Sequence, residues 1–355
     1  MAQKEQTFPV NSPITARQEA KKAFSRFALC VIIPFLAATI INLILSAIVF
    51  YMAQAGSLSE SLQSSTTFSL MISVVPLLVV FFPAVYLLTK KMPSQVPEKK
   101  PFKASQVFMF FLITIAAMVI GSFISTFVLS LLTAGQGQNS IASVISAQEI
   151  IPTIYIVLIA PILEELIFRK LMLDKLSVYG EKWAIIFGAM CFALYHINFY
   201  QLIYTFCMGL ILGYVYRKSG NLINTVIIHI CTNSLGSVFI PLVMNSVDME
   251  KVTELRELAS AGKEIPETVM NAVMPGLTIC IIFFVLYFAM VLSGIILFFK
   301  NRKKIHTEKS VILPTSKEGV SAIIGNAGML VFIVFSVLLM IFQLIMPILS
   351  STVNQ

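Results

Sequence analysis

The sequence predicts an all-α membrane protein, a polytopic bundle of about nine transmembrane helices. Of its 355 residues, 57% are apolar and 12% are charged, whereas soluble domains carry about 25% charged residues. Several apolar runs reach the roughly 20 residues that a helix needs to cross a bilayer. The formal net charge of +8 comes from basic residues that gather in alternate loops. This pattern indicates membrane insertion and argues against a nucleic-acid partner.

The N-terminal third predicts a tail and three spans. Residues 1–26 are polar and basic and precede a long apolar run, which is typical of a cytoplasmic tail rather than a cleaved signal peptide. Residues 27–133 hold the first three spans, at about 27–52, 68–89 and 107–133. The loop after the first span lacks lysine and arginine, whereas the loop after the second is rich in lysine. We therefore expect the N-terminus inside the cell.

Residues 150–244 predict four further spans, which we expect to form the catalytic core. The loop before them, 134–148, again lacks basic residues, and a tight uncharged turn joins the second and third of the four. The spans cover about 151–175, 183–199, the stretch ending at Arg217-Lys218, and 222–244.

Residues 245–275 predict a polar segment outside the cell. Its charges are mixed with an acidic balance, and apolar residues recur at every third position, which indicates a short surface helix. These residues are Val252, Leu255 and Leu258.

Residues 276–355 predict the eighth and ninth spans, at about 277–299 and 323–349. The basic loop Lys300–Lys309 separates them. Basic residues thus occur on every second side along the chain, and nine crossings place the C-terminus outside. The five cysteines all lie in apolar segments without paired spacing, so we expect neither disulfides nor a thiolate metal site.

Two adjacent carboxylates interrupt the fourth predicted span. Glu164 and Glu165 follow an uncharged run that begins at Ile150. An ionisable residue at membrane depth is costly and is therefore a candidate for function. Glu165 and Arg169 are spaced i,i+4 in the favourable order, so we expect Arg169 to hold Glu165 ionised and to leave Glu164 without a local partner. The alternative is that Arg169 is an ordinary charge flanking the inside end of the span.

Two of the three histidines lie in apolar segments. His196 lies in the fifth span, and His229 lies in the seventh with Asn233 one turn further along the same face. His306 lies in a basic loop, where we expect it to be solvated. With a helical rise of about 1.5 Å per residue, Glu164, His196 and His229 lie roughly 17, 21 and 12 Å from the cytoplasmic ends of their spans. Their side chains can therefore meet inside the bundle.

These groups suit hydrolysis of a peptide bond. A carboxylate in a dry pocket is a usable general base, imidazole can assist proton transfer, and an amide can stabilise an oxyanion. Glu164, His196 and His229 are alternatively a ligand set for zinc with an open water position. The spacing is not His-Glu-x-x-His, so no local zinc signature supports that alternative.

Three other interpretations stay open. Each histidine taken alone is often a hydrogen-bonded packing residue, and Phe192 taken alone is a core residue. Buried carboxylates also serve proton-coupled transporters, although we find no internal repeat in this sequence. A non-catalytic regulatory or immunity protein that works through complex formation is the third.

Three motifs in this order resemble the CPBP family of intramembrane proteases. They are Glu164-Glu165-x-x-x-Arg169, Phe192-x-x-x-His196 and His229-x-x-x-Asn233. The family includes the type II CAAX prenyl endopeptidases and bacterial relatives linked to bacteriocin immunity or peptide maturation. The resemblance implies an endopeptidase of a cell membrane, by expectation the bacterial plasma membrane, acting on membrane-associated proteins or peptides.

The resemblance also implies a role for each motif residue. Glu164 corresponds to the carboxylate that activates water, and His196 shares in the proton transfer. His229 and Asn233 correspond to oxyanion stabilisers, and Glu165 and Arg169 to supporting members of the site. The family is often labelled metalloprotease, with zinc implied, and a metal-free glutamate mechanism has also been argued. Asparagine is a poor zinc ligand and a good amide donor, which favours the metal-free form.

Overall fold

The computed structural model describes residues 13–100, 102–135, 145 and 149–353, of which residues 347–353 are described as backbone only. Every regular element in these ranges is a helix, which confirms the predicted all-α class. The N-terminal elements are α1 (Pro13–Gln54), α2 (Glu60–Gln63), α3 (Thr66–Pro76), η1 (Leu77–Phe81), α4 (Phe82–Thr89) and α5 (Ala104–Leu132).

The central elements carry the three motifs. They are α7 (Ile150–Ile154), η2 (Tyr155–Ile159), α8 (Ala160–Glu165), η3 (Leu166–Leu171), α9 (Met172–Leu176), η4 (Ser177–Tyr179), α10 (Glu181–Tyr195), α11 (Phe199–Ser219), α12 (Leu222–Ser234), η5 (Leu235–Phe239) and α13 (Ile240–Asn245). The C-terminal elements are α14 (Met249–Ser260), α15 (Glu267–Asn301), α16 (Ser316–Ile323) and α17 (Ala327–Val353).

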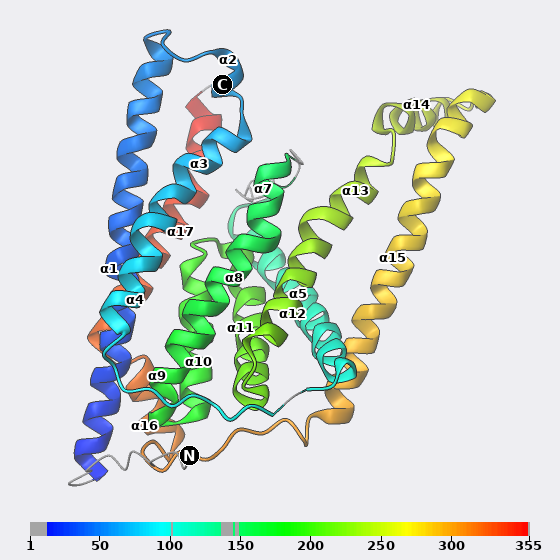
Figure 1. Cartoon of the computed structure of the whole chain (residues 1–355). Coiled ribbons are helices and arrows are strands. Elements are labelled where there is room, and N and C mark those ends of the chain that lie inside the picture. The colour runs from blue at the N-terminus through cyan, green and yellow to red at the C-terminus, as the bar shows by residue number, and fades with distance from the viewer. Residues whose placement is uncertain (1–12, 101, 136–144, 146–148, 354–355) are drawn as a thin grey trace.

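Within the described residues, eight helices are long and apolar enough to cross a membrane, so the chain is a multi-pass membrane protein. The fifth of the nine expected spans is not among these eight helices, because it corresponds to α10, which has 15 residues. Such a helix is about 22 Å long and falls short of the roughly 30 Å hydrocarbon core. Figure 1 shows its turn into α11 at about the level of α8, well below the upper end of α1.

The α10–α11 turn has a local cause. Ile197 adopts a positive φ of 47°, a conformation that ends a helix. The Asn198 side chain then accepts a hydrogen bond from the Tyr200 backbone N–H at 2.9 Å and caps α11. The predicted span boundary at residue 199 therefore falls after the helix has already reversed, and His196 lies at the turn.

Proline explains three of the four π-helical segments in the described chain. Pro83, Pro161 and Pro241 lack the N–H that would bond to the carbonyl four residues earlier. The residue before each proline donates instead to the carbonyl five residues earlier, and these bonds join Phe82 to Leu77, Ala160 to Tyr155 and Ile240 to Leu235. The fourth segment, η3, contains Arg169 and no proline. Two π segments therefore flank α8, which carries Glu164 and Glu165; such segments are frequent at functional sites.

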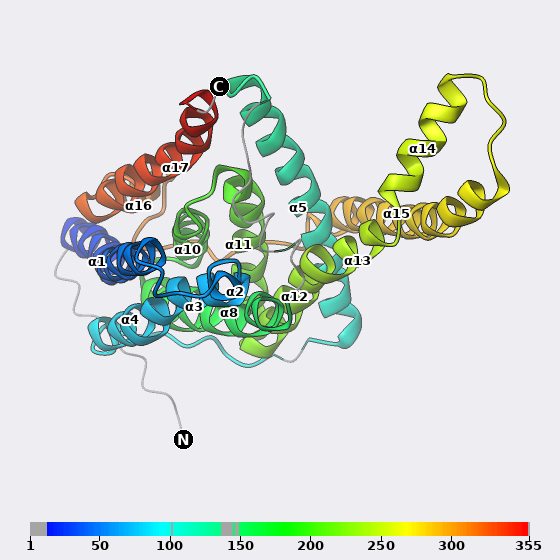
Figure 2. The same ribbon diagram turned by 90° about the horizontal axis from the view of Figure 1, so that it is seen from above.

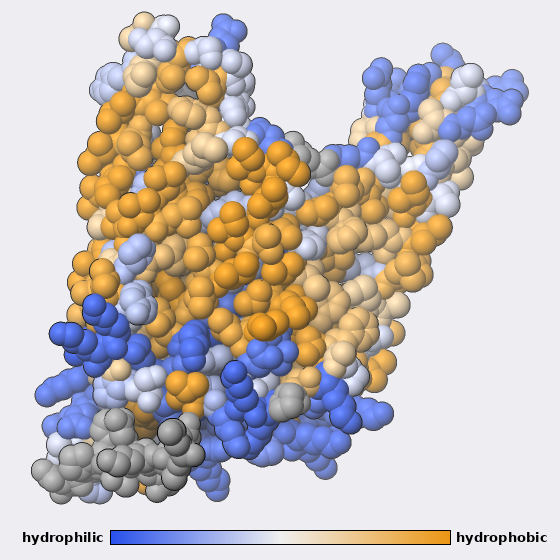
Figure 3. Space-filling model, viewed as in Figure 1, coloured by the Kyte–Doolittle hydropathy of each residue, from blue (hydrophilic) through white to orange (hydrophobic). Residues whose placement is uncertain are grey.

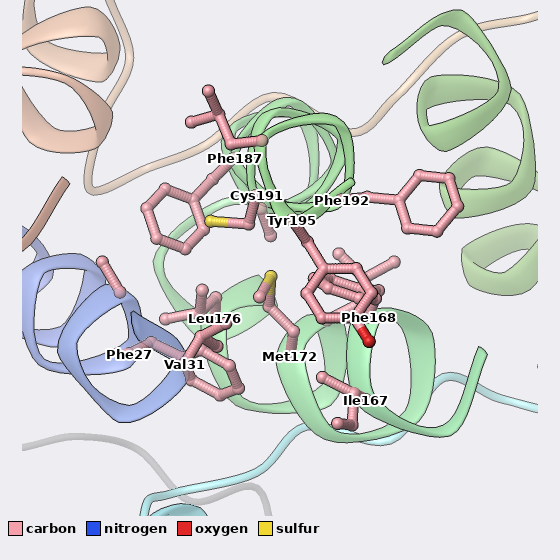
Figure 4. Close-up of a cluster of buried hydrophobic side chains, with 14 of the residues drawn as sticks. Phe27, Val31, Ile167, Phe168, Met172, Leu176, Phe187, Cys191, Phe192 and Tyr195 are labelled. Atoms are coloured by element: carbon pink, nitrogen blue, oxygen red, sulfur yellow. The ribbon is translucent and has the colours of Figure 1, made fainter. Parts of the chain in front are cut away.

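Aromatic and small residues hold the bundle together. Phe168 of η3 packs edge-on against Phe192 of α10 with ring centroids 5.2 Å apart; both belong to the buried cluster in Figure 4. A methyl group at Gly209 of α11 would come within 2.8 Å of the Ala189 Cα in α10, so the glycine permits close approach of these helices. The core therefore lies where α1, η3, α9, α10 and α11 meet, directly beside the three motifs.

The surface of the molecule is apolar over its middle and hydrophilic at its ends. Figure 3 shows an apolar band across one face of the molecule, with hydrophilic residues concentrated at its lower edge and at the tip of the α14–α15 arm. Figure 2 shows that arm projecting away from the bundle. The surface helix predicted within 245–275 is present as α14. The described ends of the chain, at α1 and α17, lie at opposite ends of the bundle (Figure 1).

Candidate active site

Four ionisable side chains from α8, η3 and α12 form one buried cluster, which we call the upper cluster. Its members are Glu164, Glu165, Arg169 and His229, with exposed fractions of 9%, 0%, 1% and 2%. Burying charges costs several kcal/mol per ion unless they are paired. Their mutual contacts therefore decide what the cluster can do.

Glu165 is held from two sides. Its Oε2 lies 3.1 Å from the Arg169 Nε, so the expected i,i+4 ion pair is present. Its Oε1 lies 3.0 Å from the His229 Nδ1, and the carboxylate accepts a hydrogen bond from that N–H. Glu165 thus fixes the orientation of the imidazole ring and directs Nε2 away from itself.

Glu164 is much less satisfied. Its Oε2 lies 3.7 Å from the His229 Nε2, which is beyond hydrogen-bond distance. No residue that the structure describes donates a hydrogen bond to Glu164. The carboxylate is therefore buried, faces an imidazole nitrogen and keeps lone pairs available for another molecule.

The Phe192 ring links the cluster to His196. The Arg169 Cζ lies 4.6 Å from the centroid of this ring, a cation–π contact. The edges of both imidazole rings approach the same phenyl ring, with centroids 4.8 Å away for His196 and 5.9 Å for His229. Phe192, which reads as a core residue in the sequence, therefore separates and orients the charged groups.

His196 is tied to the end of α10. Its Nδ1 lies 2.7 Å from the Phe192 carbonyl oxygen, so this nitrogen carries the proton and donates it to the carbonyl. Nε2 is then left for other partners, and the residue is only partly buried. In the part of the chain that the structure describes, His196 forms no hydrogen bond or ion pair with Glu164 or His229.

Asn233 is anchored to the Glu-Glu segment. Its Nδ2 donates to the Ile156 carbonyl at 2.9 Å, in the π segment η2. An amide has two N–H groups, and this bond uses one of them. Asn233 therefore joins α12 to η2 and retains one donor.

A zinc site is not formed by these residues. Within the described ranges, no group of three or more His, Cys, Asp or Glu side chains is arranged to hold a metal ion. This result includes the set Glu164, His196 and His229. We therefore derive no step through a metal.

A second polar cluster lies further along the helical stretch that begins with α8, just after Arg169. Sequence reasoning missed it. Asp174 of α9 accepts hydrogen bonds from the Lys170 Nζ and the Tyr216 hydroxyl, each at 2.8 Å. The Asp174 carbonyl also accepts from the Gln95 N–H at 2.5 Å, so the loop after α4 is fastened to the cluster. We call Lys170, Asp174 and Tyr216 the lower cluster. The i,i+4 spacing of Lys170 and Asp174 was the available signal.

Three tyrosines, also missed, line the surroundings of Glu164. Tyr155, Tyr195 and Tyr204 come from η2, α10 and α11 and lie close enough to the Glu164 carboxylate to feel its charge. Tyr195 directly precedes His196, which was the only signal in the sequence. These three tyrosines come from three different elements, so tertiary packing brings them near Glu164.

The fold and the site define a polytopic membrane protein with a buried carboxylate and imidazole cluster at the junction of three helices. Residues 146–235 match the family model described as type II CAAX prenyl endopeptidase Rce1-like. The chain thus contains a domain of the Rce1-like, or CPBP, family, and that domain includes all three motifs. Comparison with curated proteins and comparison with solved structures gave no match.

Proposed function

We propose that this protein is an intramembrane endopeptidase that hydrolyses peptide bonds of membrane-associated proteins or peptides, with water activated by Glu164. The observation that supports this most is the contrast within the upper cluster. Glu165 forms an ion pair with Arg169 and accepts a hydrogen bond from His229, whereas Glu164 is buried without a hydrogen bond and faces the His229 Nε2 at 3.7 Å. A structural carboxylate needs partners, so an unsatisfied one points to a transient ligand.

The charges of the upper cluster support a shared proton. Glu164 and Glu165 contribute two negative charges and Arg169 one positive charge, so one further proton makes the buried group neutral. The two candidate places for that proton are Glu164 and the Nε2 of His229, which face each other. With the proton on His229, Glu164 is a free carboxylate and the imidazolium Nε2–H is a donor.

This second arrangement suits attack on a peptide carbonyl. Glu164 takes a proton from water as the water oxygen bonds to the carbonyl carbon. The imidazolium of His229 and the free N–H of Asn233 donate to the oxyanion. The carbon–nitrogen bond then breaks, and the proton held by Glu164 passes to the leaving nitrogen, with His196 assisting the transfer.

The proposal includes an orientation and a division of the chain. The basic residues within 1–26, of which 13–26 form the start of α1, and the basic loops lie in the cytoplasm, and the segment 245–275 lies outside the cell. Residues 150–244 form the catalytic core, flanked by the helices of 27–133 and 276–355. We place the protein in a cell membrane, with a bilayer-embedded site in the half nearer the cytoplasm.

The test is to identify the substrate in cells. Membrane and secreted peptides are compared between cells with the wild-type protein and cells with Glu164→Gln at equal abundance. We expect at least one peptide terminus that is present with the wild type and absent with Glu164→Gln. Tyr216→Phe is the matched control, because it alters the lower cluster and leaves Glu164 in place.

Unchanged peptides in the folded variant would reject the peptidase. A function that persists in Glu164→Gln would favour a non-catalytic regulator, whereas pH-dependent solute flux into liposomes would favour a transporter.

A further inference from the structure

We propose that the groove between α5, α11 and α15 binds an anionic phospholipid, with an acyl chain in the groove and the phosphate at its basic end. The groove lies apart from the candidate active site and does not depend on peptidase activity. Its volume is about 850 Å³, within the usual range for small-molecule sites. Apolar side chains from all three helices line it, among them Phe110, Ala117, Ile120, Ile211, Ile295 and Phe298.

The groove exists because α15 packs on α5 and not on the α10–α11 pair. A methyl group at Gly294 would come within 2.1 Å of the Leu112 carbonyl oxygen, so α15 and α5 touch at this glycine. Figure 2 shows α15 beside α5 and apart from α10 and α11. In a bilayer, an apolar space of this size that opens between helices is filled by lipid chains, because it offers water too few polar partners.

One end of the groove is basic. Lys182 and His306 both line it and are exposed. The loop that leads to His306 adds four more basic residues: Lys300, Arg302, Lys303 and Lys304. The lower end of α15 and the loop after it lie at the bottom of the molecule in Figure 1, which is the hydrophilic lower edge in Figure 3. An anionic headgroup at this level meets several positive charges while its chains remain in the apolar band.

Lys182 is available for such a headgroup. The carboxylate beside it in sequence, Glu181, is taken by Lys218 at 2.9 Å. No carboxylate in the described chain lies within ion-pair distance of Lys182; its Nζ sits 4.9 Å from the centroid of the Trp183 ring. The His306 Nδ1 donates to the Lys304 carbonyl at 2.9 Å, which leaves Nε2 available. These groups favour a headgroup with a net negative charge over a zwitterionic or neutral one.

The experiment measures lipid retention by the purified full chain in detergent. Native mass spectrometry gives the fraction of protein that carries one phospholipid as phosphatidylglycerol or phosphatidylcholine with identical chains is added. We expect preferential binding of phosphatidylglycerol, about fivefold weaker in Lys182→Ala. Lys90→Ala, an exposed lysine at the end of α4, is the control and should bind as the wild type does.

Ile211→Trp tests the groove itself. The larger side chain fills the cavity without changing charge, so binding of both lipids should fall, while the melting temperature in lipid-free detergent should not.

Four results would overturn the proposal. Equal binding of the two lipids, or equal effects of Lys182→Ala and Lys90→Ala, would show that the basic end of the groove does not bind the headgroup. Unchanged binding in Ile211→Trp would show that the groove does not hold the acyl chain. Displacement of phosphatidylglycerol by a prenylated peptide would assign the groove to a substrate anchor instead.

Discussion

The upper and lower clusters share one helical stretch, α8 to α9, which carries all their members except His229 and Tyr216, yet they satisfy their charges differently. In the lower cluster, both Asp174 carboxylate oxygens accept hydrogen bonds, and the same residue ties down a loop through its backbone. In the upper cluster, Glu165 is paired, while Glu164 accepts no hydrogen bond within the described chain and the Arg169 Nη2 donates none there. Because both Asp174 oxygens are hydrogen-bonded, we infer that the lower cluster has a structural role. Because Glu164 keeps free lone pairs, we infer that the upper cluster has a catalytic role.

Breaking the ion pair of the upper cluster should have the largest effect on stability. Arg169→Met leaves the Glu165 carboxylate buried with one partner fewer, and loss of one member of a buried pair costs about 3–5 kcal/mol. Titration with a denaturing detergent in mixed micelles measures the free energy of unfolding. The double variant Glu165→Gln/Arg169→Met should recover much of that loss without recovering function. A single variant as stable as the wild type would contradict the pairing.

Asn233 tests whether the upper cluster extends to an oxyanion donor. Asn233→Ala removes the bond to the Ile156 carbonyl and the free N–H. If that N–H stabilises the oxyanion, kcat should fall about 10²–10³-fold. The control is Thr232→Val, which removes the neighbouring hydroxyl that donates to the His229 carbonyl at 2.8 Å. Equal losses of kcat in the two variants would mean that Asn233 acts through packing alone.

The lower cluster should respond in stability and not in rate. Tyr216→Phe removes one hydrogen bond to a charged carboxylate, which we expect to lower the free energy of unfolding by about 1.5–3 kcal/mol. The cleavage rate per folded molecule should stay at the wild-type value. A loss of the cleavage rate per folded molecule would show that the two clusters are coupled. It would contradict a purely structural role for the lower cluster.

The smallest effect is expected at a third polar contact, where Glu149, just before one candidate span, meets the first residues of another. Glu149 accepts hydrogen bonds from the Thr67 hydroxyl and from the Thr66 and Thr67 backbone N–H groups. These bonds, led by the hydroxyl, hold the pKa of Glu149 below its usual value. Because the folded pKa is lowered, this contact stabilises the start of α3 at neutral pH and weakens as the pH falls through the lowered pKa.

Hydrogen exchange of the Thr66 and Thr67 amides follows this contact. We expect faster exchange in Glu149→Gln than in the wild type at pH 7, with the difference vanishing in acid. A difference that persists at low pH would mean that the carboxylate charge is irrelevant.

The sequence predicts the upper cluster better than it predicts the fold around it. The i,i+4 spacing of Glu165 and Arg169 is local, so their ion pair follows from helix geometry alone. The contact of His229 with both glutamates depends on how α12 packs on α8. The depths of these residues along their helices indicated only that their side chains could come into contact. The sequence did not indicate that Asn233 would bind a backbone carbonyl, because that carbonyl belongs to a π segment.

The lower cluster and the short α10 illustrate what hydropathy leaves out. The run 183–199 is apolar throughout, yet its helix ends at Tyr195 because Ile197 takes a positive φ and Asn198 starts the next helix. Tyr216 and Asp174 are 42 positions apart and meet only through tertiary packing. Apolar runs define where the chain can enter a bilayer, whereas turns and tertiary polar contacts define how deep each helix goes.

The most direct test compares Glu164→Gln with Tyr216→Phe in proteoliposomes that contain equal amounts of folded protein and a substrate peptide found in cells. Glu164→Gln removes the proposed base, so cleavage should fall about 10²–10⁴-fold, while Tyr216→Phe should cleave at the wild-type rate. Cleavage by Glu164→Gln within a factor of two of the wild type would contradict the assignment of chemistry to the upper cluster.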